Sequence, residues 1–254
     1  MNKSPKIRLY DLEVSREVVE GYRQKYDFKV VKTIRHQELM CYAWKDLGSK
    51  KIHYVSRHHF KKYKDFVQSL ADMLNESDIS IAHNARGFDD KMSNTFFIKE
   101  GVDVPSPRKS IDTLQVARSV FRFPGNSLNQ LCEYLGIGSK EKITYADIET
   151  EFMSSPTRKI ERQMAKYNKK DVELLEKVYE RLRPYMKNHP LINTYSGNAF
   201  SCPKCGGSNL QKRGFAYTST AVYQQYACLT ENCGAWSRER TQDKTFTKPR
   251  IVNI

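Results

Sequence analysis

The feature that most constrains the fold is a short segment near the N-terminus, Ile7-Arg8-Leu9-Tyr10-Asp11-Leu12-Glu13-Val14. Its apolar and β-branched residues alternate, which predicts a β-strand. Side chains two apart share one face of a strand, so Asp11 and Glu13 lie on the same side as Leu9. Two carboxylates at the end of an apolar strand are costly to bury without cations or hydrogen bonds. Either the strand ends at Asp11 and both acids are solvated, or other groups compensate them.

Length and composition set the broad class. The chain has 254 residues, of which 39% are hydrophobic, so it can form one good-sized domain with a packed core and a small second one. No apolar run approaches the ~20 residues that span a bilayer, and residues 1–6 lack the apolar segment of a signal peptide. We therefore expect a cytoplasmic protein without a membrane partner. The net charge of +14 favours a polyanionic partner such as nucleic acid.

The pattern downstream predicts a mixture of strands and helices. Residues 15–39 are charged and aromatic without a clear period, and we expect a long excursion with some helix there. Two strands joined by a turn are expected at 40–44 and 51–56, and a short strand at 79–82. Helical spacing predicts helices at 59–76, 90–100, 113–120, 127–136 and from Ser155-Pro156 onward. This order indicates an α/β sheet with helices packed on its faces.

Further acids stand in unusual surroundings. Asp171 lies on the apolar stripe of the final helix, and Tyr167, four residues earlier, points the same way. A surface acid and a core tyrosine are the simpler interpretation. Asp89 follows a strand at a helix start, where capping is also a fair explanation. If these acids gather with Asp11 and Glu13, two divalent metals would neutralise them, as in enzymes of in-line displacement at phosphorus. Oxygen ligands favour two Mg²⁺ or Mn²⁺ ions.

Three segments together resemble a known family. Tyr10-Asp11-Leu12-Glu13, His83-Asn84-x3-Phe88-Asp89 and Tyr167-x3-Asp171-Val172 are similar to the three exonuclease motifs of the DnaQ-like (DEDD) superfamily. Tyr167, four residues before Asp171, indicates the tyrosine subclass. Lys166 stands where the histidine subclass has its histidine. Val14 departs from the threonine of many relatives, and Asp90 is a rival to Asp89. The layout of the chain looks most like exonuclease-like proteins encoded by bacteriophages.

The resemblance implies a fold and an activity. The fold would be ribonuclease H-like, a mixed sheet flanked by helices. The activity would be 3′→5′ removal of nucleotides, from single-stranded DNA in our interpretation, in the host cytoplasm if a phage encodes the chain. Metal ligands would be Asp11, Glu13, Asp89 and Asp171, and Tyr167 would position the attacking water, because an unperturbed tyrosine pKa of about 10 argues against free base action. The alternatives are a ribonuclease, a structure-specific nuclease, or a non-catalytic module that accompanies a DNA polymerase or another replication protein.

Four cysteines mark the C-terminal part of the chain. They form two close pairs, each followed by glycine, at positions Cys202, Cys205, Cys228 and Cys233. This spacing predicts a structural Zn²⁺ site of the zinc-ribbon type, and disulfides are the alternative in an oxidising compartment. We expect a catalytic domain at 1–187, a linker at 188–199 and the zinc ribbon at 200–254.

Basic and aromatic side chains predict where nucleic acid binds. After Cys233, one face of an expected strand carries Trp236, Arg238 and Arg240, a combination that suits phosphate contacts and base stacking. The alternative is a small domain that uses its aromatic residues for a core and its arginines for solubility. Lys166 and Lys170, beside the final motif, would contact phosphates nearer the acids.

Overall fold

The computed structural model describes residues 4–25, 27–139, 145–154 and 156–240. The chain divides into two compact units, one of Lys6–Val178 and one of Met1–Pro5 with Tyr179–Ile254. The division falls inside one long helix, α6 (Arg158–Leu182). The expected domain boundaries after residues 187 and 199 stay a prediction.

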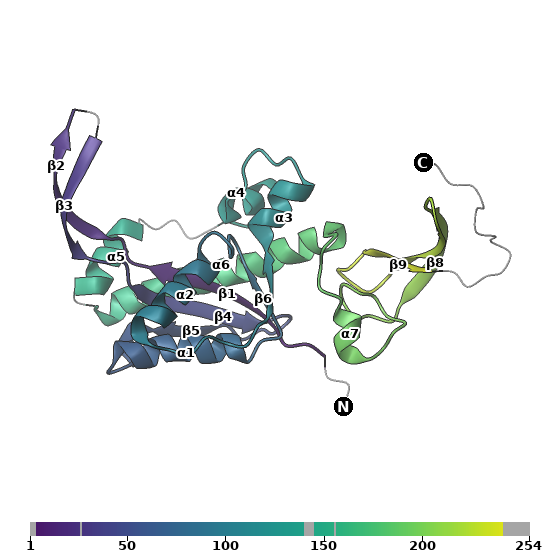
Figure 1. Cartoon of the computed structure of the whole chain (residues 1–254), viewed down its shortest axis with the longest axis horizontal. Coiled ribbons are helices and arrows are strands. Elements are labelled where there is room, and N and C mark those ends of the chain that lie inside the picture. Colours follow the sequence, from purple (N-terminus) through teal and green to yellow (C-terminus); the bar gives the residue numbers. More distant parts are fainter. Residues whose placement is uncertain (1–3, 26, 140–144, 155, 241–254) are drawn as a thin grey trace. The chain divides into compact units, whose positions relative to one another are not determined.

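The larger unit is built on a five-stranded mixed sheet (Figure 1). The central strand β1 (Ile7–Val14) runs antiparallel to β4 (Leu39–Asp46) on one side and parallel to β6 (Ile79–Ala82) on the other. Across the sheet the order is β5 (His53–Ser56), β4, β1, β6 and β7 (Lys109–Asp112). The predicted α/β architecture and the predicted antiparallel pair β4–β5 are confirmed.

Several helices of this unit are bounded by capping residues that the sequence contains. They are α1 (Tyr63–Asn75), α2 (Asp89–Glu100), α3 (Thr113–Val120), α4 (Leu128–Tyr134), α5 (Tyr145–Ser154) and the first part of α6. Asp112 caps α3 by accepting hydrogen bonds from the backbone N–H groups of the first turn. Ser127 and Gln130 form a capping box at α4, and Gly101 ends α2 in the left-handed conformation at φ 62°.

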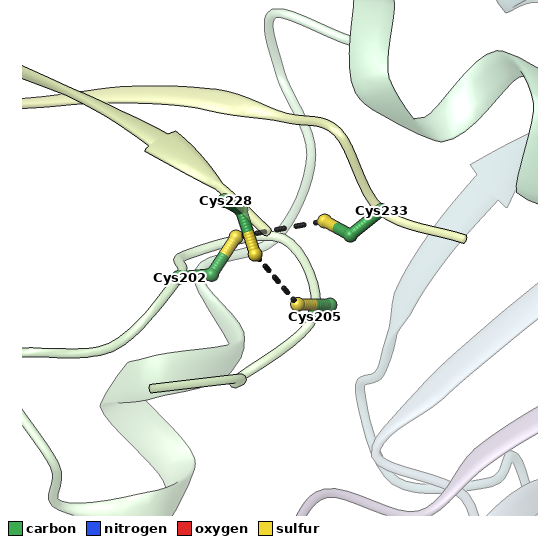
Figure 2. Close-up of side chains that lie close together, drawn as sticks. All are labelled: Cys202, Cys205, Cys228 and Cys233. Atoms are coloured by element: carbon green, nitrogen blue, oxygen red, sulfur yellow. Dashed lines mark hydrogen bonds between the residues drawn. The ribbon is translucent and has the colours of Figure 1, made fainter. Parts of the chain in front are cut away.

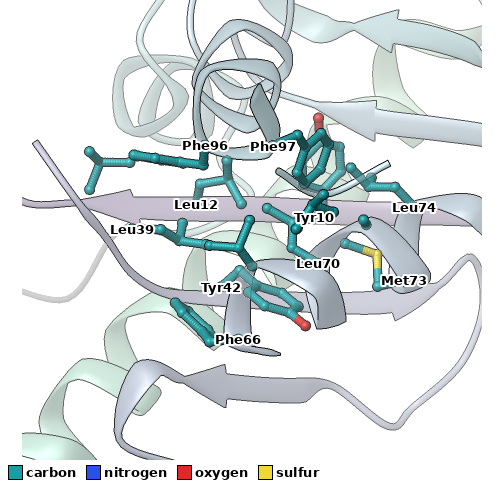
Figure 3. Close-up of a cluster of buried hydrophobic side chains, with 14 of the residues drawn as sticks. Tyr10, Leu12, Leu39, Tyr42, Phe66, Leu70, Met73, Leu74, Phe96 and Phe97 are labelled. Atoms are coloured by element: carbon teal, nitrogen blue, oxygen red, sulfur yellow. The ribbon is translucent and has the colours of Figure 1, made fainter. Parts of the chain in front are cut away.

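The main core fills the space between the sheet and helices α1 and α2 (Figure 3). Tyr10 and Leu12 of β1 contribute to it, together with Tyr42 of β4 and Phe66 and Leu70 of α1. Neighbouring residues of a strand point to opposite faces. Asp11 and Glu13 therefore project from the other face of the sheet, away from this core.

The prediction for residues 15–39 was wrong. This stretch forms an antiparallel two-stranded ribbon, β2 (Val18–Gln24) and β3 (Asp27–Arg35), which makes a sheet of its own. No helix is described there. The ribbon is exposed on both faces, so no alternation of apolar and polar residues announces it. Helix α5 was also missed, and α6 begins at Arg158, three residues after the expected start.

The smaller unit contains a short helix and a three-stranded sheet. Helix α7 (Ile192–Ser196) precedes the cysteines, within the stretch expected to be a linker. Strands β8 (Leu210–Tyr217), β9 (Val222–Cys228) and β10 (Trp236–Arg240) pair antiparallel in the order β10-β9-β8, and β10 is the strand expected after Cys233. Among the described residues, no helix is both long and apolar enough to cross a membrane.

Candidate active site

Three acids from two elements meet on the face of the sheet that is opposite the main core. Asp11 and Glu13 come from β1 and Asp171 from α6, and their ligand oxygens all lie within 4.8 Å of one another. Glu13 and Asp171 are buried, and Asp11 is half-buried. Like charges this close repel strongly unless a cation or a proton intervenes. The three acids thus lie close together, as predicted, and a bound cation would relieve their repulsion.

The chemistry of this donor set fits a hard divalent metal. All three groups are carboxylates, and Mg²⁺ and Mn²⁺ prefer oxygen ligands. Two neighbouring oxygens on one octahedral Mg²⁺ lie about 3 Å apart, given metal–oxygen distances of about 2.1 Å. A group that spans at most 4.8 Å reaches this geometry with small side-chain movements.

Asn168 is a member of the site that the sequence reading missed. Its Nδ2 donates to Asp11 Oδ2 at 2.7 Å and to the Asp11 backbone oxygen at 3.3 Å. Asn168 is fully buried, and its Oδ1 has no hydrogen-bond partner in the described part of the chain. These two bonds hold the carboxylate of Asp11 in one rotamer. The only signal in the sequence was its position, three residues before Asp171 on the same helix face.

Asp89 approaches β1 from the first turn of α2. Because the pairing of β1 with β6 ends at Leu9, the N–H of Leu12 lacks a strand partner on that side. Asp89 Oδ1 accepts this N–H at 3.3 Å. Burial raises the pKa of the Asp89 carboxyl well above its usual range, and the charge of Asp11 raises it further. Asp89 thus stands beside Asp11 but outside the group of three oxygens within 4.8 Å.

The neighbouring Asp90 has a different set of contacts. Its Oδ1 accepts from the Tyr10 hydroxyl at 2.9 Å and forms an ion pair with Arg108 at 3.2 Å. Its Oδ2 accepts from the Ser110 hydroxyl at 2.9 Å. These three partners explain the position of Asp90 as a support of the core. The preference for Asp89 over Asp90 as a site residue is consistent with this geometry.

The loop that leads into Asp89 is held by Asp112. The carboxylate of Asp112 accepts the backbone N–H groups of Asn84 and Arg86, each at 3.0 Å. Asn84 has a positive φ of 74°, a conformation that asparagine tolerates. His83 is fixed by contacts of 2.9 Å with the Thr113 hydroxyl and the Asn126 backbone oxygen. The segment between β6 and α2 is therefore rigid where it brings Asp89 to β1.

The remaining predicted residues of this region lie on α6. Tyr167 is half-buried one turn before Asp171, on the helix that also carries Asn168. Lys166 is exposed, whereas Lys170 forms an ion pair with Glu173 at 3.0 Å. Lys166 is therefore the more solvent-exposed of these two lysines.

Comparison with known families decides the classification. The model of the RNase H superfamily matches residues 35–183, more than half of the chain. The chain belongs to the RNase H superfamily. The matched region starts after β1, the strand with Asp11 and Glu13. This strand pairs with β4, which lies inside the matched region, so both belong to one sheet. Membership supports a nuclease-type function, which implies binding of nucleic acid.

Solved structures show the same fold. The chain is similar to the family B DNA polymerase from the hyperthermophilic archaeon Pyrobaculum calidifontis, with a TM-score of 0.56 and 13% sequence identity. The similarity covers 86% of this chain and 32% of the polymerase, so the RNase H-like protein corresponds to about a third of that enzyme's length. No curated protein matches the chain.

Beyond the RNase H region, the four cysteines come together as predicted (Figure 2). Their sulfur atoms lie 3.8 Å apart between Cys202 and Cys233 and 3.7 Å apart between Cys205 and Cys228. All four cysteines are free in this structure, and both sulfur separations are far longer than a disulfide bond. The edge of a sulfur tetrahedron around zinc is about 3.8 Å for Zn–S bonds of about 2.3 Å. The geometry is compatible with a zinc ribbon.

The local environment of Cys205 favours its thiolate form. Hydrogen bonds from Cys202 and then from Cys233 hold the pKa of the Cys205 thiol well below its usual range. The Gly207 N–H donates to Cys205 Sγ at 3.3 Å. Backbone N–H groups directed at sulfur stabilise the thiolate form that binds metal.

The predicted nucleic-acid face of the smaller unit is partly exposed. Trp236 is 56% exposed, and the guanidinium of Arg238 lies 4.4 Å from the centre of the Tyr223 ring. Tyr226, in contrast, is buried and packs edge-on against Phe200. The backbone of Arg240 ends β10, but its side chain lies outside the described part of the chain. The aromatic residues therefore divide between a small core and an open surface.

Proposed function

We propose that the protein is a metal-dependent 3′→5′ exonuclease of the DnaQ-like tyrosine subclass that acts on single-stranded DNA. The observation that carries this proposal is the gathering of Asp11, Glu13 and Asp171 within 4.8 Å on an RNase H fold. A site formed entirely by carboxylates suits phosphodiester hydrolysis with two metal ions. The order of the three motifs along the chain supports the subclass.

Each residue has a role that follows from its position. Asp11, Glu13 and Asp171, with Asp89 beside them, would hold two Mg²⁺ or Mn²⁺ ions. Bound there, the ions would supply an activated water and neutralise charge on the leaving 3′ oxygen. Asn168 holds Asp11 in one rotamer through two hydrogen bonds. Tyr167, one turn before Asp171, would orient the attacking water. Lys166 would contact the phosphate backbone.

The smaller unit would add structure and binding surface. Cys202, Cys205, Cys228 and Cys233 would hold a structural Zn²⁺, which the sulfur separations support. Trp236, Arg238 and Arg240 would contact single-stranded DNA. The likeness to part of a DNA polymerase supports action beside a polymerase or another replication protein. An origin in a bacteriophage, acting in the host cytoplasm, stays part of this proposal.

A direct test uses DNA and RNA strands labelled at either end, with and without Mg²⁺. A 3′→5′ exonuclease should convert 5′-labelled DNA into a ladder of shortening strands and release the 3′ label at once as a mononucleotide. EDTA should stop both reactions. Cleavage of RNA in preference to DNA would support a ribonuclease instead. Binding of DNA without any cleavage in Mg²⁺ or Mn²⁺ would contradict an exonuclease and indicate a non-catalytic module.

A further inference from the structure

The ribbon of β2 and β3 is an exposed element with no role in the site described above. It stands apart from the five-stranded sheet in Figure 1. Large hydrophobic side chains remain exposed on it, including Tyr22 and Phe28 at 49% each and Val31 at 67%. Two strands alone are marginally stable in water, and an exposed apolar patch of this kind marks a binding surface.

The base of the ribbon is tied firmly to the active-site region. Ser15, at its start, lies two residues after Glu13. The Ser15 N–H donates to the Glu38 backbone oxygen at 2.8 Å, and the Glu38 N–H donates to Ser15 Oγ at 3.0 Å. Arg16 is bound to the buried carboxylate of Glu149 on α5 through its backbone N–H at 2.7 Å and its side chain at 2.5 Å. The ribbon is therefore a fixed extension of β1, the strand that carries Asp11 and Glu13.

Charge indicates what the ribbon binds. Residues 18–35 contain five Lys or Arg and two Asp or Glu. These basic residues by themselves have a simpler explanation than nucleic-acid binding, because charged residues protect exposed strand edges from pairing with other chains. That explanation does not account for the aromatic rings beside them.

The register of the ribbon places one ring and one cation opposite each other on each face. Tyr22 pairs with Lys29, and Arg23 pairs with Phe28. Residues directly opposite in an antiparallel pair share a face. The Phe28 ring lies against Gly21, where a Cβ would come within 2.8 Å of it. An aromatic ring and a cation on the same face suit a nucleobase and its phosphate.

We infer that the β2–β3 ribbon binds the single-stranded nucleic acid that leads to the acidic site. This inference rests on the proposed nuclease function, because the bound strand is the substrate of that site. Seven paired positions at about 3.3 Å each give the ribbon a reach of about 23 Å. Cations would contact phosphates along this length, and Tyr22 or Phe28 would stack on bases.

Two face-specific variants test the inference. One is Tyr22→Leu with Lys29→Gln, and the other is Arg23→Gln with Phe28→Leu. Leucine retains apolar bulk, so the ribbon keeps its packing against Gly21. Binding of fluorescent oligothymidylate is measured in EDTA over a range of salt concentrations, which makes the result independent of cleavage. Thermal unfolding of each variant checks that the fold is intact.

The face that holds the strand should show two losses at once. Affinity should fall about 5- to 160-fold for one lost stacking contact of about 1–3 kcal/mol. The slope of log affinity against log salt should decrease by about 0.7 for one lost phosphate contact. A matched control, Lys50→Ala with Lys51→Ala, removes two exposed cations from the turn at the far end of β4 and should leave both quantities unchanged.

Other outcomes would overturn the inference. If both face variants bind oligothymidylate as the wild type does, the ribbon does not hold the strand. If instead they change the sedimentation of the protein alone, the ribbon binds a second copy of the chain. Hydrolysis of a dinucleotide, which is too short to reach the ribbon, should be unaffected in every variant. If the wild type cleaves no nucleic acid at all, the proposed nuclease function is refuted. The binding measurements in EDTA still test whether the ribbon binds the strand.

Discussion

Replacing Asp171 by asparagine should stabilise the metal-free protein. Its carboxylate lies within 4.8 Å of the oxygens of Asp11 and Glu13. Two unit charges at this distance repel by about 3.5 kcal/mol at an effective dielectric constant of about 20. Uptake of a proton by one carboxyl and screening by salt reduce this repulsion. We expect a net gain of about 1–2 kcal/mol in the free energy of unfolding, since asparagine keeps the shape and one acceptor oxygen.

Thermal unfolding of the larger unit, which contains the acids, is followed by tryptophan fluorescence. The chain has two tryptophans, Trp44 in β4 and Trp236 in the smaller unit. In a Trp236→Phe background, tryptophan fluorescence reports the larger unit alone. A gain of 1–2 kcal/mol corresponds to a midpoint about 2–8 °C higher in EDTA for a chain of this size.

Bound metal should make the wild type more stable than Asp171→Asn. At a Mn²⁺ concentration about a hundred times the dissociation constant, binding stabilises the wild type by about 2.7 kcal/mol. Asp171→Asn should gain much less, because it lacks a ligand. The stability of the two proteins should therefore cross as Mn²⁺ replaces EDTA.

A matched variant tests the reasoning about repulsion. Glu149→Gln also converts a buried acid to its amide, but Glu149 is paired with Arg16. Loss of that charge-assisted bond should destabilise the protein in EDTA. If Asp171→Asn lowers the midpoint in EDTA as Glu149→Gln does, Asp171 is stabilised by favourable contacts, and the two-metal interpretation of the cluster would be refuted.

Further expected outcomes concern individual residues. Tyr167→Phe should slow DNA hydrolysis while Mn²⁺ affinity stays near that of the wild type; much weaker Mn²⁺ binding would make Tyr167 a structural support. Asn168→Ala should weaken Mn²⁺ binding about 10–100-fold, as loss of a group that orients a ligand does, and an unchanged titration would exclude that role. Cys202→Ser should release zinc and unfold the smaller unit without moving the Trp44 transition; joint unfolding would mean one cooperative unit. Arg238→Ala should lower the salt slope for single-stranded DNA by about 0.7 with turnover at saturation unchanged, and an unaltered slope would argue against a contact.

Several features of the protein follow from local sequence alone. The alternation of side chains along β1 predicts Asp11 and Glu13 on one face and Tyr10 and Leu12 on the other. The structure confirms this arrangement. Helical spacing places Asp171 on the buried stripe of α6. Caps at α3 and α4 are also visible in the sequence. Side-chain periodicity and end-capping act within a few residues, so a linear pattern contains them.

Tertiary structure alone decided the remaining features. Asn168 contacts Asp11 across 157 positions of the chain, and its place near Asp171 on α6 does not by itself predict that bond. Asp89 and Asp90 are adjacent and identical in type, yet one lies beside Asp11 and the other is bonded to Tyr10 and Ser110. The β2–β3 ribbon buries neither face, so it leaves no hydrophobic period to read. Contacts between distant segments depend on how the sheet and helices pack, and that packing exists only in the folded chain.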